Sequence, residues 1–314
     1  MRRKAIIISL SGTKLTNKEK KLFINNIPWG VILFKRNINN YIQIKNLIIS
    51  IKKLTKDKKY PILIDEEGGS VSRLLNIFDN RPYSQNFFGR LFENEEALSI
   101  SLYENYINSM CSVFKKIGIN INTVPVLDLL QNKTHPIIGS RSFSNKHKTV
   151  DALGKICIKT YLKNKIGTVI KHIPGHGPST SDSHKKLPVV NKKYKKLKVD
   201  FDRFFNSDSF FAMTAHILYS QIDNKNVCTT SNEIISKIIR KKLKFKGILI
   251  SDDISMKALK GDLVTNAKKS ISAGCNLALY CAGNINDSFN LIKETPFIDK
   301  FTAKKTSEFY NFLR

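Results

Sequence analysis

The sequence predicts an α/β protein built as a single (β/α)8 barrel, the TIM-barrel fold, over residues 1–314. Eight short apolar runs alternate with longer segments of helical spacing, and strands that alternate with helices form parallel sheets. Eight such units in 314 residues match a closed barrel better than an open doubly wound sheet. No GxGxxG pattern follows the first run, which disfavours a dinucleotide-binding fold.

The expected strands are short apolar runs rich in branched and aromatic residues. They lie at residues 5–9, 30–34, 61–65, 120–126, 167–172, 211–215, 247–251 and 277–281. Between them, apolar residues recur every three or four positions, which predicts helices with one face on a sheet. These helices are expected at residues 17–26, 41–55, 93–117, 146–164, 192–205, 231–243, 265–273, 285–294 and 300–312. No low-complexity linker interrupts the alternation, so we expect one domain.

Polar residues follow several of these runs at the point where the expected strand ends. The carboxyl ends of barrel strands meet at one mouth, which is where barrel enzymes act. We therefore expect one functional site that gathers the following side chains: Asp65, Asp128, Lys171, His172, His216 and Asp252.

The chain is strongly basic, with 53 Lys and Arg against 25 Asp and Glu and a formal net charge of +28. Such a charge suits a nucleic-acid or anionic membrane partner. Lysine is nevertheless spread along the whole chain, and no RNP, zinc-finger or helix-turn-helix pattern accompanies it. We expect no specific nucleic-acid partner, and a non-catalytic basic barrel that binds nucleic acid stays open as an alternative.

Cysteine usage and hydropathy predict a soluble, cytoplasmic protein. The five cysteines form no CxxC pair, which favours reduced thiols. The apolar run after the basic start covers only about seven residues, too short for the core of a signal peptide. No stretch approaches the roughly 18 apolar residues that a membrane span needs, so we expect no membrane partner.

The stretch KHIPGHGPSTSDSHKKLPVV (171–190) follows the fifth apolar run and concentrates chemically active side chains. Asp182 and His184 are two positions apart, so the carboxylate can orient the imidazole and support its positive charge. The alternative is a solvated loop. His172, His176 and His184 also suggest zinc, but they lack the shared helical face of an HExxH motif. We expect no metal and no cofactor.

Asp252 follows the seventh apolar run and is a candidate nucleophile, general base or metal ligand. Its alternative is the N-cap of the following helix. Asp253 points elsewhere on the pleat and is expected to brace the next loop. Four further residues suit hydrogen bonding to a polyhydroxylated substrate, and the alternative for each is an ordinary salt bridge: Asp65, Arg73, Arg141 and Lys171.

The sequence resembles the bacterial β-N-acetylhexosaminidases of glycoside hydrolase family 3. KHxPGHG followed by DSH is highly specific, and it is paired with ISDD. The resemblance covers the chain almost from end to end, through GVILFKRNI (30–38), IDEEGGSVSRL (64–74), NTVPVLD (122–128), GSRSFS (139–144), KHIPGHG with DSHKKLPVV, MTAHILYSQID (213–223), GILISDDISM (247–256) and AGCN (273–276).

The resemblance implies a TIM barrel that removes terminal β-linked N-acetylglucosamine from cell-wall fragments with retention of configuration. By motif, Asp252 is the nucleophile and His184 is the acid/base, paired with Asp182. The residues expected to hold the sugar are Asp65, Arg73, Arg141, Lys171 and His172. The implied substrate is a muropeptide or a chitobiose-like small molecule, and the implied enzyme is a monomer.

Three positions depart from the family pattern: Glu66 replaces the usual Gln, Ser70 a common Arg, and Asn276 the usual Asp. Glu66 is expected to add negative charge beside Asp65 and to disturb sugar binding there. A family 3 β-glucosidase is the nearest alternative, although such enzymes generally use a carboxylate from elsewhere in place of the DSH loop. A metal-dependent barrel hydrolase is a further alternative.

Overall fold

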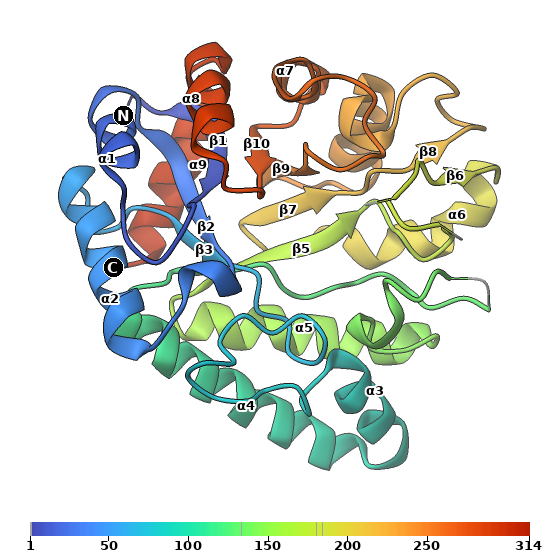
Figure 1. Cartoon of the computed structure of the whole chain (residues 1–314). Coiled ribbons are helices and arrows are strands. Elements are labelled where there is room, and N and C mark those ends of the chain that lie inside the picture. Colours follow the sequence, from blue (N-terminus) through green and yellow to red (C-terminus); the bar gives the residue numbers. More distant parts are fainter. Residues whose placement is uncertain (1, 133, 180, 184) are drawn as a thin grey trace.

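The computed structural model describes residues 2–132, 134–179, 181–183 and 185–314, and within them it contains a closed barrel of eight parallel strands (Figure 1). Around the barrel the strand order is β1-β10-β9-β7-β5-β4-β3-β2. Their bounds are β1 Lys4–Ser9, β2 Pro28–Leu33, β3 Ile62–Ile64, β4 Ile121–Asn122, β5 Gly167–Ile173, β7 Phe211–Thr214, β9 Ile248–Asp253 and β10 Leu277–Tyr280. The predicted (β/α)8 fold is therefore confirmed.

Every expected strand is present, but β4 ends earlier than predicted. Pro125 lacks the amide hydrogen that a ladder needs, which accounts for the interruption of the pairing after Asn122. The chain returns to the barrel at Val126, which forms an isolated parallel bridge with Lys171. The polar residues that follow β4 are therefore carried by an irregular segment at the barrel mouth.

Helices surround the barrel in Figure 1. They are α1 Asn17–Asn25, α2 Tyr41–Leu54, α3 Gln85–Asn94, α4 Glu96–Ile117, α5 His147–Lys163, α6 Tyr194–Phe201, the π-helix Ile234–Lys242, α7 Leu263–Ala273, α8 Ile285–Glu294 and α9 Lys300–Phe312. The prediction of one helix over 93–117 was wrong at its start. The helical pattern there spans two helices that break at Glu95, and the hydroxyl of Ser84 caps the first by accepting from Phe87 N at 3.1 Å.

Aromatic side chains close the amino-terminal end of the barrel. Phe309 of α9 packs edge-on against Phe211 with ring centroids 5.0 Å apart, and Phe211 packs against Trp29 at 5.5 Å. Trp29 donates its indole hydrogen to the hydroxyl of Thr306 at 2.8 Å, so its polar atom is satisfied inside the core. With this end filled, the opposite end is the one that a ligand can enter.

A second, two-stranded sheet lies outside the barrel and was not expected. Its parallel strands are β6 (Val189–Val190) and β8 (Leu218–Tyr219). They join the long loop after β5 to the loop after β7, so the segment that carries Asp182 is anchored at its far end. No helix in the described part of the chain is long and apolar enough to cross a membrane.

Candidate active site

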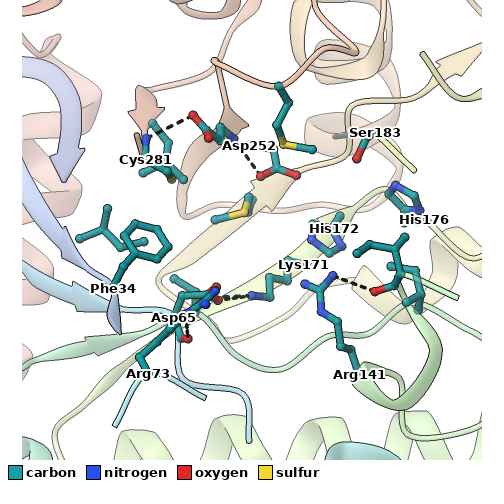
Figure 2. A pocket seen from close by; sticks show the side chains of 18 residues that line it. Phe34, Asp65, Arg73, Arg141, Lys171, His172, His176, Ser183, Asp252 and Cys281 are labelled. Carbon is teal, nitrogen blue, oxygen red and sulfur yellow. Dashed lines mark hydrogen bonds and ion pairs between the residues drawn. The ribbon is translucent and has the colours of Figure 1, made fainter. Parts of the chain in front are cut away.

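A cavity of about 130 Å³ opens at the carboxyl ends of the barrel strands (Figure 2). Six of the predicted site residues line it: Asp65, Arg73, Arg141, Lys171, His172 and Asp252. In Figure 2, Asp252 lies across the cavity from Lys171, Asp65 and Arg73. Ser183, the neighbour of Asp182, lines it too, whereas the predicted acid/base His184 lies outside the described residues.

Asp65 is the centre of an ion cluster on one wall. Its Oδ1 accepts hydrogen bonds from Lys171 Nζ at 2.8 Å and from the Thr123 hydroxyl at 2.6 Å. Its Oδ2 accepts from Arg73 Nη2 at 2.6 Å. Burial alone would raise the pKa of Asp65, but the charges of Lys171 and Arg73 outweigh it and hold that pKa well below its ordinary value. Asp65 is therefore an acceptor, never a proton donor, at neutral pH.

Glu67 connects this cluster to Arg141. Its carboxylate accepts from Arg141 Nε and Nη2 at 2.8 Å each and pairs with Lys171 Nζ at 2.5 Å. The Glu67 side chain is only 1% exposed, so Arg141 and Lys171 are held by a carboxylate that is buried behind them. Burial would raise the pKa of Glu67, but Arg141 and Lys171 lower it below its ordinary value.

Sequence reasoning missed Glu67 and left two interpretations of the four polar residues open. The salt bridges expected as the alternative are present, because Asp65, Arg73, Arg141 and Lys171 pair within one network that includes Glu67. The same four residues also line the cavity. The available signal was the run Asp65-Glu66-Glu67 at the end of an expected strand, since several carboxylates there need cations nearby.

Glu66, which was expected to disturb sugar binding beside Asp65, does not line the cavity. Its Oε2 accepts from the backbone amides of Arg73 and Leu74 at 2.7 and 2.9 Å, and its Oε1 accepts from Asn80 Nδ2 at 2.6 Å. Glu66 therefore shapes the loop that presents Arg73. The other two departures are also remote from the cavity, since Ser70 is exposed and Asn276 lies at the amino end of β10.

The carboxylate of Asp128 accepts hydrogen bonds from the backbone amides of His172 and His176, and it also contacts the ring of His172. It accepts from His176 N and stands 2.7 Å from Nδ1 of His172. Burial would raise the pKa of Asp128, but the two histidines lower it. Burial also lowers the pKa of His176 to about 4, so that ring is neutral.

Asp252 extends from the end of β9, and its Oδ1 accepts from Asp253 N at 2.8 Å. The N-cap alternative is wrong, because the N-cap of α7 is Asp262. The bracing role predicted for Asp253 is confirmed: its carboxylate accepts from Ser255 N, the Ser255 hydroxyl and Cys281 N at 3.1, 2.7 and 3.2 Å.

His216, expected at the mouth, is fully buried and structural. Its Nδ1 bonds the Thr229 hydroxyl at 2.6 Å and its Nε2 bonds the carbonyl of Asp253 at 3.0 Å. Both ring nitrogens are thus used to fix the end of β9, and His216 does not line the cavity. Its effect on the site is indirect, through the position of the backbone that carries the aspartates.

The loop that carries Asp182 lies against the segment after β9. Ala258 N donates to the carbonyl of Ser183 at 3.2 Å, and the amides of Lys185 and Lys186 donate to the carbonyl of Asp182. Asp182 is 7% exposed. The loop that follows β5 therefore meets the loop that follows Asp252 beside the cavity.

Zinc was the alternative for the histidines of this loop. Over residues 2–132, 134–179, 181–183 and 185–314, no three His, Cys, Asp or Glu side chains are grouped so that they could hold a metal ion.

The chain matches the model of the glycosyl hydrolase family 3 N-terminal domain over residues 4–297. A β-hexosaminidase of Haemophilus influenzae is 32% identical over 284 residues, which covers 88% of this chain and 79% of the relative. A β-hexosaminidase of Neisseria meningitidis is 30% identical over 283 residues, which covers 88% and 77%.

Among solved structures, NagZ from Neisseria gonorrhoeae in complex with N-trifluoroacetyl-D-glucosamine superposes with a TM-score of 0.89 and 26% identity, covering 100% of this chain and 90% of that one. A family 3 β-N-acetylglucosaminidase from Paenibacillus shares the fold, with a TM-score of 0.87 at 23% identity. The barrel fold and the extent of these matches agree: the chain belongs to glycosyl hydrolase family 3 and is a glycosidase.

Proposed function

We propose that the protein is an exo-acting β-N-acetylglucosaminidase that removes terminal, non-reducing β-linked N-acetylglucosamine with retention of configuration. The observation that carries the proposal is the cavity in which Asp252 lies across from the cluster of Asp65, Arg73 and Lys171. One wall offers fixed charges and donors to sugar hydroxyls, and the other offers a carboxylate. A small cavity of about 130 Å³ suits one terminal sugar better than an internal stretch of polymer.

In the proposed mechanism Asp252 attacks the anomeric carbon of the sugar. The bond from that carbon to the leaving oxygen breaks as protonated His184 donates its proton to that oxygen. Neutral His184 then takes a proton from water, which displaces the Asp252 carboxylate and releases the sugar. Two inversions give net retention. Asp182 stabilises the imidazolium form of His184.

The remaining cavity residues bind and orient the sugar in this proposal. Lys171 and Arg141 are held by Glu67, and Arg73 is held by Asp65, so their positions are set before substrate arrives. Such preorganised groups stabilise a transition state without reorganising at the moment of reaction. Buried ion pairs also lose little side-chain entropy on binding, because they are already ordered.

For the natural substrate we propose peptidoglycan fragments, N-acetylglucosamine linked to 1,6-anhydro-N-acetylmuramic acid with or without its peptide, in cytoplasmic cell-wall recycling. Two observations support this choice. The relative NagZ was crystallised with an N-acylated glucosamine. The formal net charge of +28 would attract fragments that carry carboxylates.

The proposal is tested by comparing hydrolysis of an aryl β-N-acetylglucosaminide with the matching β-glucoside. Turnover of the acetamido sugar alone, abolished in Asp252→Asn and strongly reduced in His184→Ala, is the expected result. Preference for the glucoside would make the protein a family 3 β-glucosidase. Turnover that survives in Asp252→Asn would reject the assigned nucleophile.

A further inference from the structure

We infer that Asp128 is a positioning residue that fixes a hydrogen on Nδ1 of His172 and so presents Nε2 of that ring to a sugar hydroxyl. The inference rests on the proposed function, because it takes His172 to contact the sugar. The sequence motif that contains His172 predicts neither its pairing with Asp128 nor the tautomer of its ring, because the two residues are 44 positions apart in the chain.

The geometry places Asp128 behind the imidazole and away from the cavity. Asp128 is 1% exposed and does not line the cavity, whereas His172 does. One carboxylate oxygen, Oδ2, stands 2.7 Å from His172 Nδ1. The other, Oδ1, accepts from His176 N at 2.5 Å, and both oxygens are 3.3 Å from His172 N. Three donors around one carboxylate leave it a single orientation.

This arrangement decides which ring nitrogen carries a hydrogen. An ionised carboxylate only accepts hydrogen bonds, so a short contact to it requires a hydrogen on Nδ1. The pKa of Asp128 is held below its ordinary value by the two histidines, against the effect of burial, which keeps the carboxylate ionised at neutral pH. In the neutral ring, Nε2 is then an acceptor. It is the ring nitrogen that Asp128 does not contact, on a residue that lines the cavity.

An acceptor at this point has a specific consequence for sugar recognition. A hydroxyl can donate to Nε2, whereas fluorine or an ether oxygen at the same position cannot. Asp128 would therefore select for a free hydroxyl without touching the sugar. The same carboxylate fixes the backbone of His176, whose ring lies 5.6 Å from that of His172 between centroids, so the ring of His172 is confined on two sides.

Asp128→Asn reverses the tautomer with little change of shape. The amide oxygen can still accept from His176 N, while the amide nitrogen donates to His172 Nδ1 and moves the ring hydrogen to Nε2. Asp200→Asn is the matched control, because Asp200 is a buried carboxylate that bonds Gln131 and does not line the cavity. Thermal unfolding of both variants checks that they fold.

The first readout is the nitrogen-15 spectrum of histidine-labelled enzyme without substrate, with His172 assigned by its loss in His172→Gln. A hydrogen on Nδ1 in the unsubstituted enzyme and on Nε2 in Asp128→Asn is expected. A hydrogen on Nε2 in the unsubstituted enzyme, alone or together with one on Nδ1, overturns the inference. This readout needs no turnover, so it still decides the tautomer if the protein proves inactive on N-acetylglucosaminides and the proposed function fails.

The second readout is kcat/KM for an aryl N-acetylglucosaminide and for analogues whose 3-, 4- or 6-hydroxyl is replaced in turn by fluorine. One replacement should cost the unsubstituted enzyme about ten- to a hundredfold, the effect of one hydrogen bond to a buried partner. For Asp128→Asn, kcat/KM on the unfluorinated compound should be lower by a similar factor. The same fluorine replacement should then change kcat/KM of this variant very little. Equal sensitivity of both enzymes to every replacement would overturn the inference, as would an equal loss in Asp200→Asn.

Discussion

Glu67 and Arg141 form two parallel hydrogen bonds of 2.8 Å beneath the cavity, and the same carboxylate pairs with Lys171. A planar guanidinium matches a carboxylate in this way, which fixes the direction of the arginine as well as its charge. One buried glutamate thus sets the position of two groups that are proposed to hold the sugar.

Glu67→Gln is expected to weaken both substrate binding and the fold. The substitution leaves two buried cations short of a negative charge, and removing one partner of a buried pair typically costs about 3–5 kcal/mol. We expect a higher KM for an aryl N-acetylglucosaminide and a lower free energy of unfolding, measured by kinetics and urea denaturation. Glu66→Gln is the control, since Glu66 is buried next door and faces away from the cavity. Equal KM values in the two variants would contradict the assignment of Glu67 as the residue that positions Arg141 and Lys171.

Asp200 is expected to make stability depend on pH. Burial raises its pKa from 3.8 to about 6 in the folded protein. A carboxyl whose folded pKa is raised stabilises the fold while it is protonated in both states, and this contribution is lost as pH rises through the folded value. Relative to Asp200→Asn, the unsubstituted protein should lose about 2–3 kcal/mol between pH 4 and 6 and then change no further. Urea denaturation of both proteins at several pH values measures this, and parallel curves would refute it.

Cys281 lines the cavity but is expected to react slowly with alkylating agents. Burial and the carboxylates of Asp253, Asp252 and Asp65 raise the pKa of its thiol well above the ordinary value, against the opposing effect of Arg36. Because the thiolate is the reactive form, iodoacetamide near pH 8 should leave activity intact while it labels the urea-unfolded protein fully. Mass spectrometry locates the label. Fast inactivation with label on Cys281 would contradict the expectation.

The barrel could be predicted because buried parallel strands appear in a sequence as continuous apolar runs. The position of the site at the barrel mouth could also be predicted, because Asp65, Lys171 and Asp252 all stand where such runs end. What the sequence could not supply is the pairing of side chains across elements. Arg141 lies 74 positions from Glu67, and no local pattern links them.

For the same reason, the sequence could not show that the side chain of Glu66 lies outside the cavity. Successive residues at a strand end point in different directions, so Glu66 and Glu67 play opposite parts although they are chemically alike. Only the fold decides which one meets the cations. The broken helix at Glu95 has a related cause, because both halves carry apolar residues at helical spacing and the break leaves no proline or glycine to mark it.

The proposed mechanism requires Asp252 to become covalently bonded to the sugar. The enzyme would be mixed with an aryl β-N-acetylglucosaminide that has a good leaving group, quenched with acid during turnover, and digested for mass spectrometry. We expect the peptide containing Asp252 to gain the mass of one N-acetylhexosyl group, and the same peptide of Asp252→Asn to show no gain. An adduct on another residue, or a released sugar of inverted configuration with no adduct, would contradict it.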